Sequence, residues 1–210
     1  MSLFTSVADI NRLIAALPQV DDVTQNKAAA RQSQLTKPPG SLGKLEDIAI
    51  WMAGWQRTER LDIGHGQCLV FAGNHGVVAQ GVSPFPADVT AQMVQNFEAG
   101  GAAINQLCRV AGLDLRVSAI QLDTPTRDFT TGPAMTVDEV LAAMNEGAES
   151  IADDCDYLIV GEMGIGNSTA AAALCLGRFG ADATGWVGPG TGLDEVGVAH
   201  KAAVIDQALA

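Results

Sequence analysis

The chain has 210 residues, of which 48% are hydrophobic and 17% are charged, and its formal net charge is −12 at pH 7. This composition is typical of a folded globular protein and excludes a disordered chain. The acidic balance argues against nucleic acid or an anionic membrane as a partner, because both require a basic face. The sequence shows neither the long apolar run of a membrane span nor the pattern of a signal peptide.

The cysteines and histidines show no metal-binding spacing. The four cysteines include no C-x-x-C pair and the three histidines no H-x-x-x-H pair, so we expect neither a structural metal nor a cofactor. Three of the cysteines have apolar neighbours in the sequence, as expected for small buried side chains in a reducing compartment. We therefore expect a cytoplasmic protein.

The first 60 residues are predicted to form part of a small helical domain. Apolar residues recur at helical spacing, and Pro18 and the turn-forming segment 37–43 separate the periodic stretches. The expected helices cover residues 7–17, 21–35 and 45–56. The last one carries an apolar stripe that we expect to lie in the core: Ile48, Trp51, Met52 and Trp55.

Residues 61–210 are predicted to form an α/β domain. Short apolar runs typical of strands alternate with helical patterns. The strands are expected at residues 68–72, 115–120, 157–160 and 184–187, and the helices at 86–97, 102–110, 137–152 and 170–178. Thr136, with Glu139 three residues later, has the pattern of a capping box. The alternation predicts right-handed crossovers and a parallel sheet, in which ligands bind beyond the carboxyl ends of the strands.

Two glycine-rich segments lie about thirty residues apart. The first, 161–169, separates an apolar run from an Ala-rich helical stretch, and the second, 188–192, precedes a helical run that includes Lys201. A strand, a glycine loop and a helix in succession aim backbone N–H groups at an anion. The pair predicts a phosphate site with Lys201 as a point charge. Two ordinary tight turns are the alternative interpretation.

The first loop matches neither common nucleotide motif in full. Asn167 stands where a P-loop requires lysine, so a triphosphate would be poorly neutralised. Thr169 stands where the dinucleotide fingerprint requires its last glycine. The site is therefore expected to be of monophosphate size, and a P-loop-like NTPase is the weaker alternative.

Three further segments are too specific to be only turns and core. They read KPPGSLGKLE at 37–46, GNHGV at 73–77 and GVSPFP at 81–86, the last leading into VTAQMV at 89–94. With the two glycine loops, in this order and spacing, they closely resemble the nicotinate-nucleotide–dimethylbenzimidazole phosphoribosyltransferase family. The resemblance implies transfer of phosphoribose from nicotinate mononucleotide to 5,6-dimethylbenzimidazole, giving α-ribazole 5′-phosphate and nicotinate. It also implies a homodimer, with a Rossmann-like domain and a small helical domain built from both chain ends.

Residue by residue, the resemblance implies two groups of binding residues. The group for phosphate and ribose is Glu162, Gly164, Gly166, Asn167, Gly190, Thr191, Gly192 and Lys201. The group for the base is Ser83, Phe85 and Gln92. Simple packing is the alternative for Phe85, and a solvated helix face is the alternative for Gln92. His75 is expected to be a turn residue bonded to backbone, and Asn74 replaces the aspartate that the family commonly has before this histidine.

No catalytic residue is expected within these 210 residues. The family's general-base glutamate lies in a C-terminal Gly-Glu-Gly motif that no position here matches, and Glu162 is not expected to replace it. The sequence ends at Ala210 inside a helical pattern with no stop signal, so we expect an α/β domain that is incomplete at its C-terminus and nearly inactive. A complete, non-catalytic phosphate-binding module is the alternative. No metal is expected, because nicotinate mononucleotide has no diphosphate to neutralise.

Overall fold

A computed structural model describes residues 3–210, which divide into two compact units. The smaller unit covers residues 6–64, and the larger one covers residues 65–210 together with the described residues before Ser6. The smaller unit contains α1 (Val7–Ala15), α2 (Asp22–Gln32) and α3 (Lys44–Gln56). The amide of Asp21, the residue before α2, donates to the carbonyl of Gly54 in α3 at 3.1 Å, and so ties these two helices together.

The apolar stripe predicted for the core of the helical unit is wrong. Ile48, Trp51 and Trp55 are 48%, 58% and 45% exposed. The buried residues of α3 are instead Ala53 and Gly54. Residues two positions from Ala53 lie on nearly the opposite side of a helix, so burying the small residues turns both tryptophans outward.

The larger unit is built on a three-stranded parallel sheet, which confirms the predicted fold class. The strands are β1 (Gly66–Ala72), β2 (Asp114–Ala119) and β3 (Tyr157–Met163), in the order β2-β1-β3. Ala72 at the end of β1 lies opposite Ala119 of β2 and Met163 of β3, so the three carboxyl ends are level. The chain leaves β1 toward β2 and later returns to the other side of β1. A crevice at this reversal of strand order is where open α/β sheets bind ligands.

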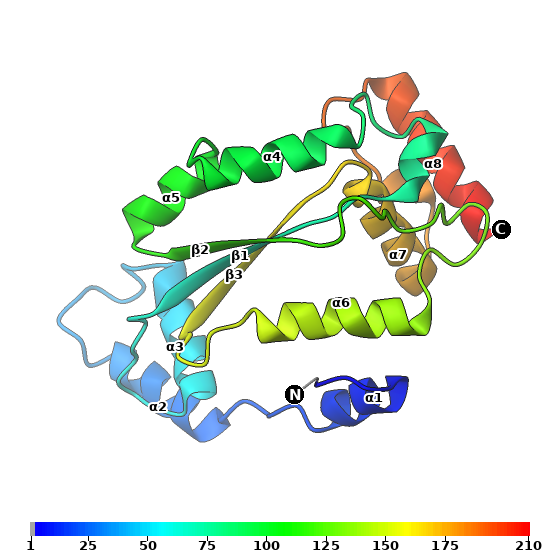
Figure 1. The fold of residues 1–210 in the computed structure, drawn as a ribbon. Helices are drawn as coiled ribbons and strands as arrows, with labels where there is room; N and C mark the ends of the chain where they lie inside the picture. Colours follow the sequence, from blue (N-terminus) through cyan, green and yellow to red (C-terminus); the bar gives the residue numbers. More distant parts are fainter. Residues whose placement is uncertain (1–2) are drawn as a thin grey trace. The chain divides into compact units, whose positions relative to one another are not determined.

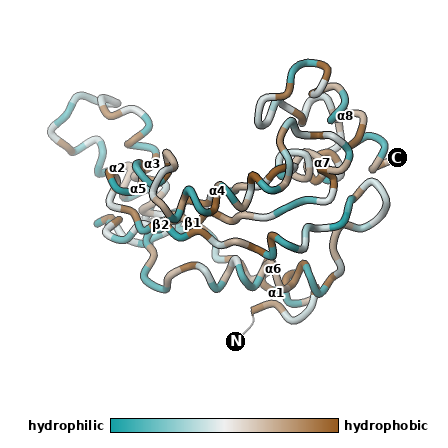
Figure 2. The backbone as a smooth tube through the Cα atoms, turned by 45° about the horizontal axis from the view of Figure 1, so that its top comes forward, coloured by the Kyte–Doolittle hydropathy of each residue, from teal (hydrophilic) through white to brown (hydrophobic). Residues whose placement is uncertain are grey.

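Helices cover both faces of the sheet (Figure 1). The helices α4 (Asp88–Glu98) and α5 (Ala103–Ala111) lie on one face, and α6 (Val137–Glu149) lies on the other. In Figure 2 the α4 and α6 segments alternate between hydrophilic and hydrophobic residues, as helices with one buried face do. The capping box predicted at the start of α6 is confirmed, because Thr136 and Glu139 each bond the other's backbone N–H.

The last two long helices, α7 (Asn167–Phe179) and α8 (Glu195–Leu209), follow the carboxyl end of β3. Small side chains of α7 pack on α8 in a buried cluster: Ala172, Ala173, Ala183, Ala202 and Ile205. The fourth strand predicted at residues 184–187 is wrong. A short 3₁₀ turn, Ala183–Gly185, lies there, because Ala183 is buried in this cluster and its carbonyl accepts from Trp186 and Val187.

Two further features of the described chain complete the fold. A second 3₁₀ turn, Gly76–Gln80, follows β1 and leads toward α4. None of the helices among residues 3–210 is both long and apolar enough to cross a bilayer.

Candidate functional site

The first glycine loop links β3 to α7 and is held tightly against the neighbouring strand end. Gly166 precedes the first residue of α7 and has φ 86°, a left-handed conformation that favours glycine. A side chain at Gly164 would place its Cβ 2.2 Å from the carbonyl oxygen of Gly73, which follows β1. Only glycine allows this approach. The loop therefore lies in the crevice between β1 and β3, with the start of α7 directly behind it.

A buried threonine from another helix fixes this loop. The hydroxyl of Thr90 in α4 accepts a hydrogen bond from the backbone N–H of Ile165 at 3.1 Å, and both residues are almost fully buried. No signal in the sequence singles out Thr90, since a single threonine in a helical pattern is not distinctive. Its role depends on the packing of α4 over the loop.

Replacing Thr90 with valine is expected to lower the free energy of unfolding by about 1–3 kcal/mol, because the buried N–H of Ile165 loses its acceptor while the shape is kept. Thr169→Val is the matched control. Thr169 is equally buried, and its hydroxyl has no hydrogen-bond partner among residues 3–210, so its removal is expected to be neutral or stabilising. Urea unfolding of both variants measures the difference. Equal effects would contradict the role assigned to Thr90.

Lys201 of α8 presents its ammonium group to the same loop. The side chain is 1% exposed, and its Nζ donates to the Ser168 hydroxyl at 2.8 Å and to the Gly188 carbonyl at 3.4 Å. Burial lowers the pKa of Lys201 from its usual value. The ion pairs found among residues 3–210 do not include Lys201. A buried ammonium with only neutral oxygens around it is suited to bind an anion.

The second glycine loop differs from the prediction. No strand precedes it, and α8 begins only at Glu195. The carboxylate of Asp194 caps α8 by accepting from the N–H of Gly197 at 2.8 Å, so this helix start is already occupied by a negative charge. The second loop therefore contributes its turn, residues 189–191, and α8 contributes Lys201 from its interior. Of α7 and α8, only α7 begins without a side-chain cap.

Most of the predicted binding residues surround one cavity of about 270 Å³. The predicted residues in its lining are Ser83, Glu162, Gly164, Gly166, Gly190, Thr191 and Lys201. Ser168, which is not among the predicted binding residues, also lines it. Ser83 and Thr191 approach each other across this cavity, with 3.3 Å between their hydroxyl oxygens.

The remaining predicted residues lie elsewhere. Asn167 lines a neighbouring cavity, and Gly192 lines neither of the two. Phe85 and Gln92 are also absent from both linings and are exposed. Their contact with the base therefore stays a prediction.

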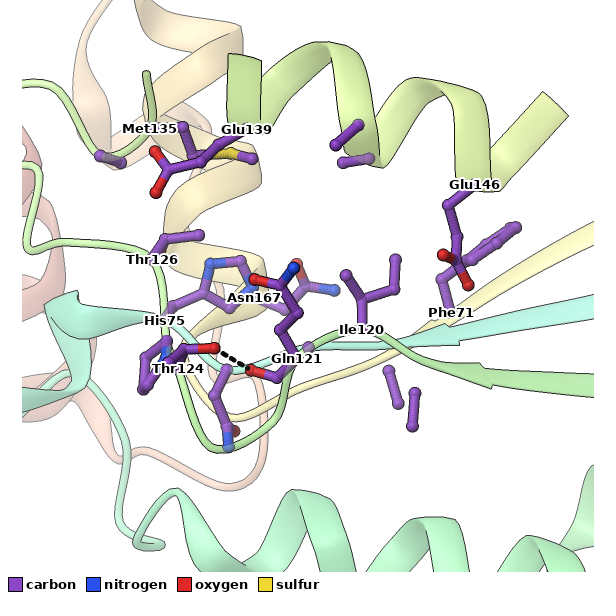
Figure 3. A pocket seen from close by; sticks show the side chains of 18 of the residues that line it. Phe71, His75, Ile120, Gln121, Thr124, Thr126, Met135, Glu139, Glu146 and Asn167 are labelled. Carbon is purple, nitrogen blue, oxygen red and sulfur yellow. Dashed lines mark hydrogen bonds between the residues drawn. The ribbon is translucent and has the colours of Figure 1, made fainter. Parts of the chain in front are cut away.

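The neighbouring cavity is larger, about 680 Å³, and lies between the carboxyl edge of the sheet and α6. Figure 3 shows its walls, with Phe71 and Ile120 near the strand ends, Glu139 and Glu146 on α6, and His75 beside Asn167. Glu162 lines both cavities. Burial lowers the pKa of His75, while the neighbouring Asn167 side chain and the charge of Glu162 act in the opposite direction. His75 precedes the 3₁₀ turn and pairs with Thr126 through its backbone, as expected of a turn residue.

The described residues show no dedicated metal site. Among residues 3–210, no three His, Cys, Asp or Glu side chains gather as a metal ion would require. The four cysteines are all free. The groups that line the smaller cavity include glycine-loop backbone, the hydroxyls of Ser83, Ser168 and Thr191, the buried ammonium of Lys201 and the carboxylate of Glu162.

Comparison with known proteins places this geometry in a family. A family profile described as phosphoribosyltransferase matches residues 17–210. Two curated relatives, both named nicotinate-nucleotide–dimethylbenzimidazole phosphoribosyltransferase, come from Rhodobacter capsulatus and Novosphingobium aromaticivorans. Each is 56% identical over the whole chain, which covers 63% of the first relative and 62% of the second.

A solved structure agrees with the sequence comparison. The crystal structure of CobT from Thermus thermophilus superposes with a TM-score of 0.82 at 38% identity, over 89% of this chain and 62% of that one. The chain thus spans about three fifths of the length of the relatives that it matches. By profile, sequence and fold, it belongs to the nicotinate-nucleotide–dimethylbenzimidazole phosphoribosyltransferase family.

Proposed function

We propose that this chain supplies the nucleotide-binding part of an enzyme that transfers phosphoribose from nicotinate mononucleotide to 5,6-dimethylbenzimidazole, giving α-ribazole 5′-phosphate and nicotinate. The observation that carries the proposal is the buried ammonium of Lys201 beside the open, glycine-rich start of α7. In this proposal the phosphate accepts from Lys201 and from backbone N–H groups near Gly164, Gly166 and Gly190. The names of the relatives support the choice of substrates.

The chemistry of the substrates fits such a site. The base nitrogen of nicotinate mononucleotide is a pyridinium, so nicotinate leaves C1′ neutral at nitrogen and no diphosphate has to be neutralised. The enzyme must hold one phosphate, one ribose and one flat acceptor in register, which is a task of positioning. The acceptor must also lose its N–H proton, and a carboxylate base is suited to take it.

We assign no general base to these 210 residues. Glu162 is better suited to accept hydrogen bonds from the ribose hydroxyls, because it lies on the wall of the cavity that Lys201 also lines. We therefore propose that this stretch binds the nucleotide but converts dimethylbenzimidazole slowly or not at all. The resemblance implies a homodimer, and the cysteine pattern suits a cytoplasmic location, and we include both in the proposal.

Calorimetry with three related ligands tests the binding half of the proposal. Nicotinate mononucleotide is expected to bind at least about tenfold more tightly than nicotinate riboside, which lacks the phosphate that Lys201 would contact. Ribose 5-phosphate, which lacks the base, is expected to bind more weakly than the full nucleotide. Equal affinities for nucleotide and riboside would refute the phosphate site. Equal affinities for nucleotide and ribose 5-phosphate would favour a general phosphate-binding module instead.

A further inference from the structure

One side chain that lines the smaller cavity is not among the proposed phosphate contacts. Ser168, the second residue of α7, is exposed and lies in the wall of this cavity. Its hydroxyl oxygen lies 2.8 Å from the Nζ of Lys201, which α8 supplies. A Cβ at Gly190, in the second glycine loop, would lie 3.2 Å from the same hydroxyl oxygen and 3.6 Å from the Nζ. Three segments of the chain therefore meet at this point of the cavity wall.

The direction of the hydrogen bond between Ser168 and Lys201 follows from the chemistry of the two groups. An ammonium group has only donors, so the hydroxyl oxygen must accept, and the hydrogen of the hydroxyl is left for another partner. Among residues 3–210 this hydrogen has no acceptor, because Lys201 is the partner found for the Ser168 side chain. Since the side chain is exposed, its hydrogen can donate to a ligand in the cavity.

The backbone at the start of α7 supplies further donors. The N–H of Asn167 donates to the Gly164 carbonyl at 3.1 Å, and the N–H of Thr169 donates to the Gly166 carbonyl at 3.0 Å. Within the described part of the chain, the N–H groups of Gly166 and Ser168 donate to no acceptor. Free N–H groups at a helix start favour an anion there. Ser168 therefore offers both its N–H and its O–H, beside a buried ammonium.

We propose that Ser168 is a further ligand of the phosphate, and that the Lys201 ammonium orients its hydroxyl so that the two groups bind the anion as a pair. The inference rests on the proposed function, because it uses the same cavity. A tetrahedral anion can present one oxygen to Lys201, one to the Ser168 hydroxyl and one to the N–H groups of the glycine loops. A carboxylate has only two oxygens, in one plane with its carbon, and cannot reach all three sets of donors.

The ligand class of this pair is therefore a phosphate monoester or a sulfate, and this choice bears on the orientation of the proposed substrate. Nicotinate mononucleotide carries a phosphate at one end and a carboxylate on its base. Charge alone would let either end approach Lys201, whereas the added hydroxyl of Ser168 favours the phosphate. Ser168 then determines which end of the nucleotide enters the smaller cavity, as well as how tightly it binds.

Thermal melts of the ligand-free chain test the pair. Ser168→Ala is expected to lower the melting temperature by about 2–4 °C, because the buried ammonium loses its nearer acceptor. In a Lys201→Met background, where no ammonium needs that acceptor, the same change is expected to have little effect. Ser33→Ala is the control, because it removes an exposed hydroxyl that bonds the Ala30 carbonyl at the end of α2, and its effect should be the same in both backgrounds. Equal effects of Ser168→Ala in the two backgrounds would overturn the proposal.

Calorimetric titration with sulfate, inorganic phosphate and malonate tests the ligand class. Ser168→Ala is expected to weaken sulfate and phosphate about tenfold, and Ser168→Thr, which keeps the hydroxyl, is expected to recover most of the loss. Malonate, a dicarboxylate with the charge of sulfate, should bind at least about tenfold more weakly than sulfate to the unaltered chain, and Ser168→Ala should change its affinity little.

The outcomes separate this inference from the proposed function. If Lys201→Met weakens phosphate while Ser168→Ala does not, or if malonate binds as tightly as sulfate, the role of Ser168 is overturned and the phosphate site stands. If the unaltered chain binds neither phosphate nor nicotinate mononucleotide, both proposals fail.

Discussion

Replacing Lys201 with methionine is expected to weaken phosphate binding about 10- to 100-fold and, in the same protein, to raise the melting temperature of the ligand-free chain. The first effect follows from loss of the ammonium that faces the cavity. The second follows from its burial: the Nζ has only the Ser168 hydroxyl and the Gly188 carbonyl as partners, and no carboxylate offsets the cost of removing the charge from water. Methionine fills a similar volume without a charge.

The stability gain is expected to be at least about 1 kcal/mol at neutral pH, or about 2–4 °C in melting temperature for a chain of this size. Its pH dependence has a definite sign. Burial lowers the pKa of Lys201, so between its folded and unfolded values the folded state binds fewer protons than the unfolded state. The burial penalty is complete below the folded pKa and is relieved as the pH rises toward the unfolded value of 10.5. The advantage of methionine should therefore shrink in alkaline solution.

Lys27→Met is the matched control, because Lys27 is an exposed lysine of α2 with one long ion pair to Glu59 at 3.8 Å. It should change neither phosphate affinity nor the melting temperature appreciably. Calorimetric titration with phosphate and thermal melts across the pH range give both readouts. A Lys201→Met variant with a lower melting temperature than the unaltered chain, or with the same affinity for phosphate, would show that this lysine is structural.

The parts of the fold that could be predicted are those with a local signal. Helical periodicity located the helices to within a few residues, and the Thr136–Glu139 spacing identified the start of α6. The glycine pattern around 161–166 predicted a strand, a tight turn and a helix start, because positive φ and close backbone approach leave few alternatives to glycine. These features depend on neighbours in the sequence.

The predictions that failed depended on neighbours in space. Val187 and the residues before it have strand-like composition, yet Ala183 is drawn into the contact between α7 and α8. The tryptophans of α3 form a periodic stripe, and the small residues on the other face were buried instead. In both cases tertiary packing outweighed local preference.

The residue types of the site were predictable from the sequence, whereas the hydrogen bonds between these residues were not. Lys201 was identified as a point charge, but its hydrogen bond to Ser168 requires α7 and α8 to pack side by side. Asp194 is of a residue type that commonly caps helices, but no start was predicted for α8, so this cap was missed.

Adding a single methyl group at Gly164 is expected to abolish phosphate binding and to lower the free energy of unfolding by about 2–4 kcal/mol. The Cβ of Gly164→Ala would lie 2.2 Å from the Gly73 carbonyl oxygen, which is backbone and cannot rotate away. Relief requires the glycine loop to separate from the end of β1, and the N–H of Gly73 would then lose its hydrogen bond to the Met163 carbonyl, now 3.0 Å long. The N–H groups at the start of α7 would move with the loop.

Gly147→Ala provides the matched control, because Gly147 lies inside α6 with nothing within 4 Å of its Cβ position. Alanine there is expected to stabilise the chain by about 0.5–1 kcal/mol and to leave phosphate affinity unchanged. Urea unfolding and calorimetric titration of the two variants separate loop geometry from the general effect of replacing a glycine. A Gly164→Ala chain that still binds phosphate would mean that the anion does not use this loop, since no arrangement of the loop in contact with Gly73 has room for the added methyl group.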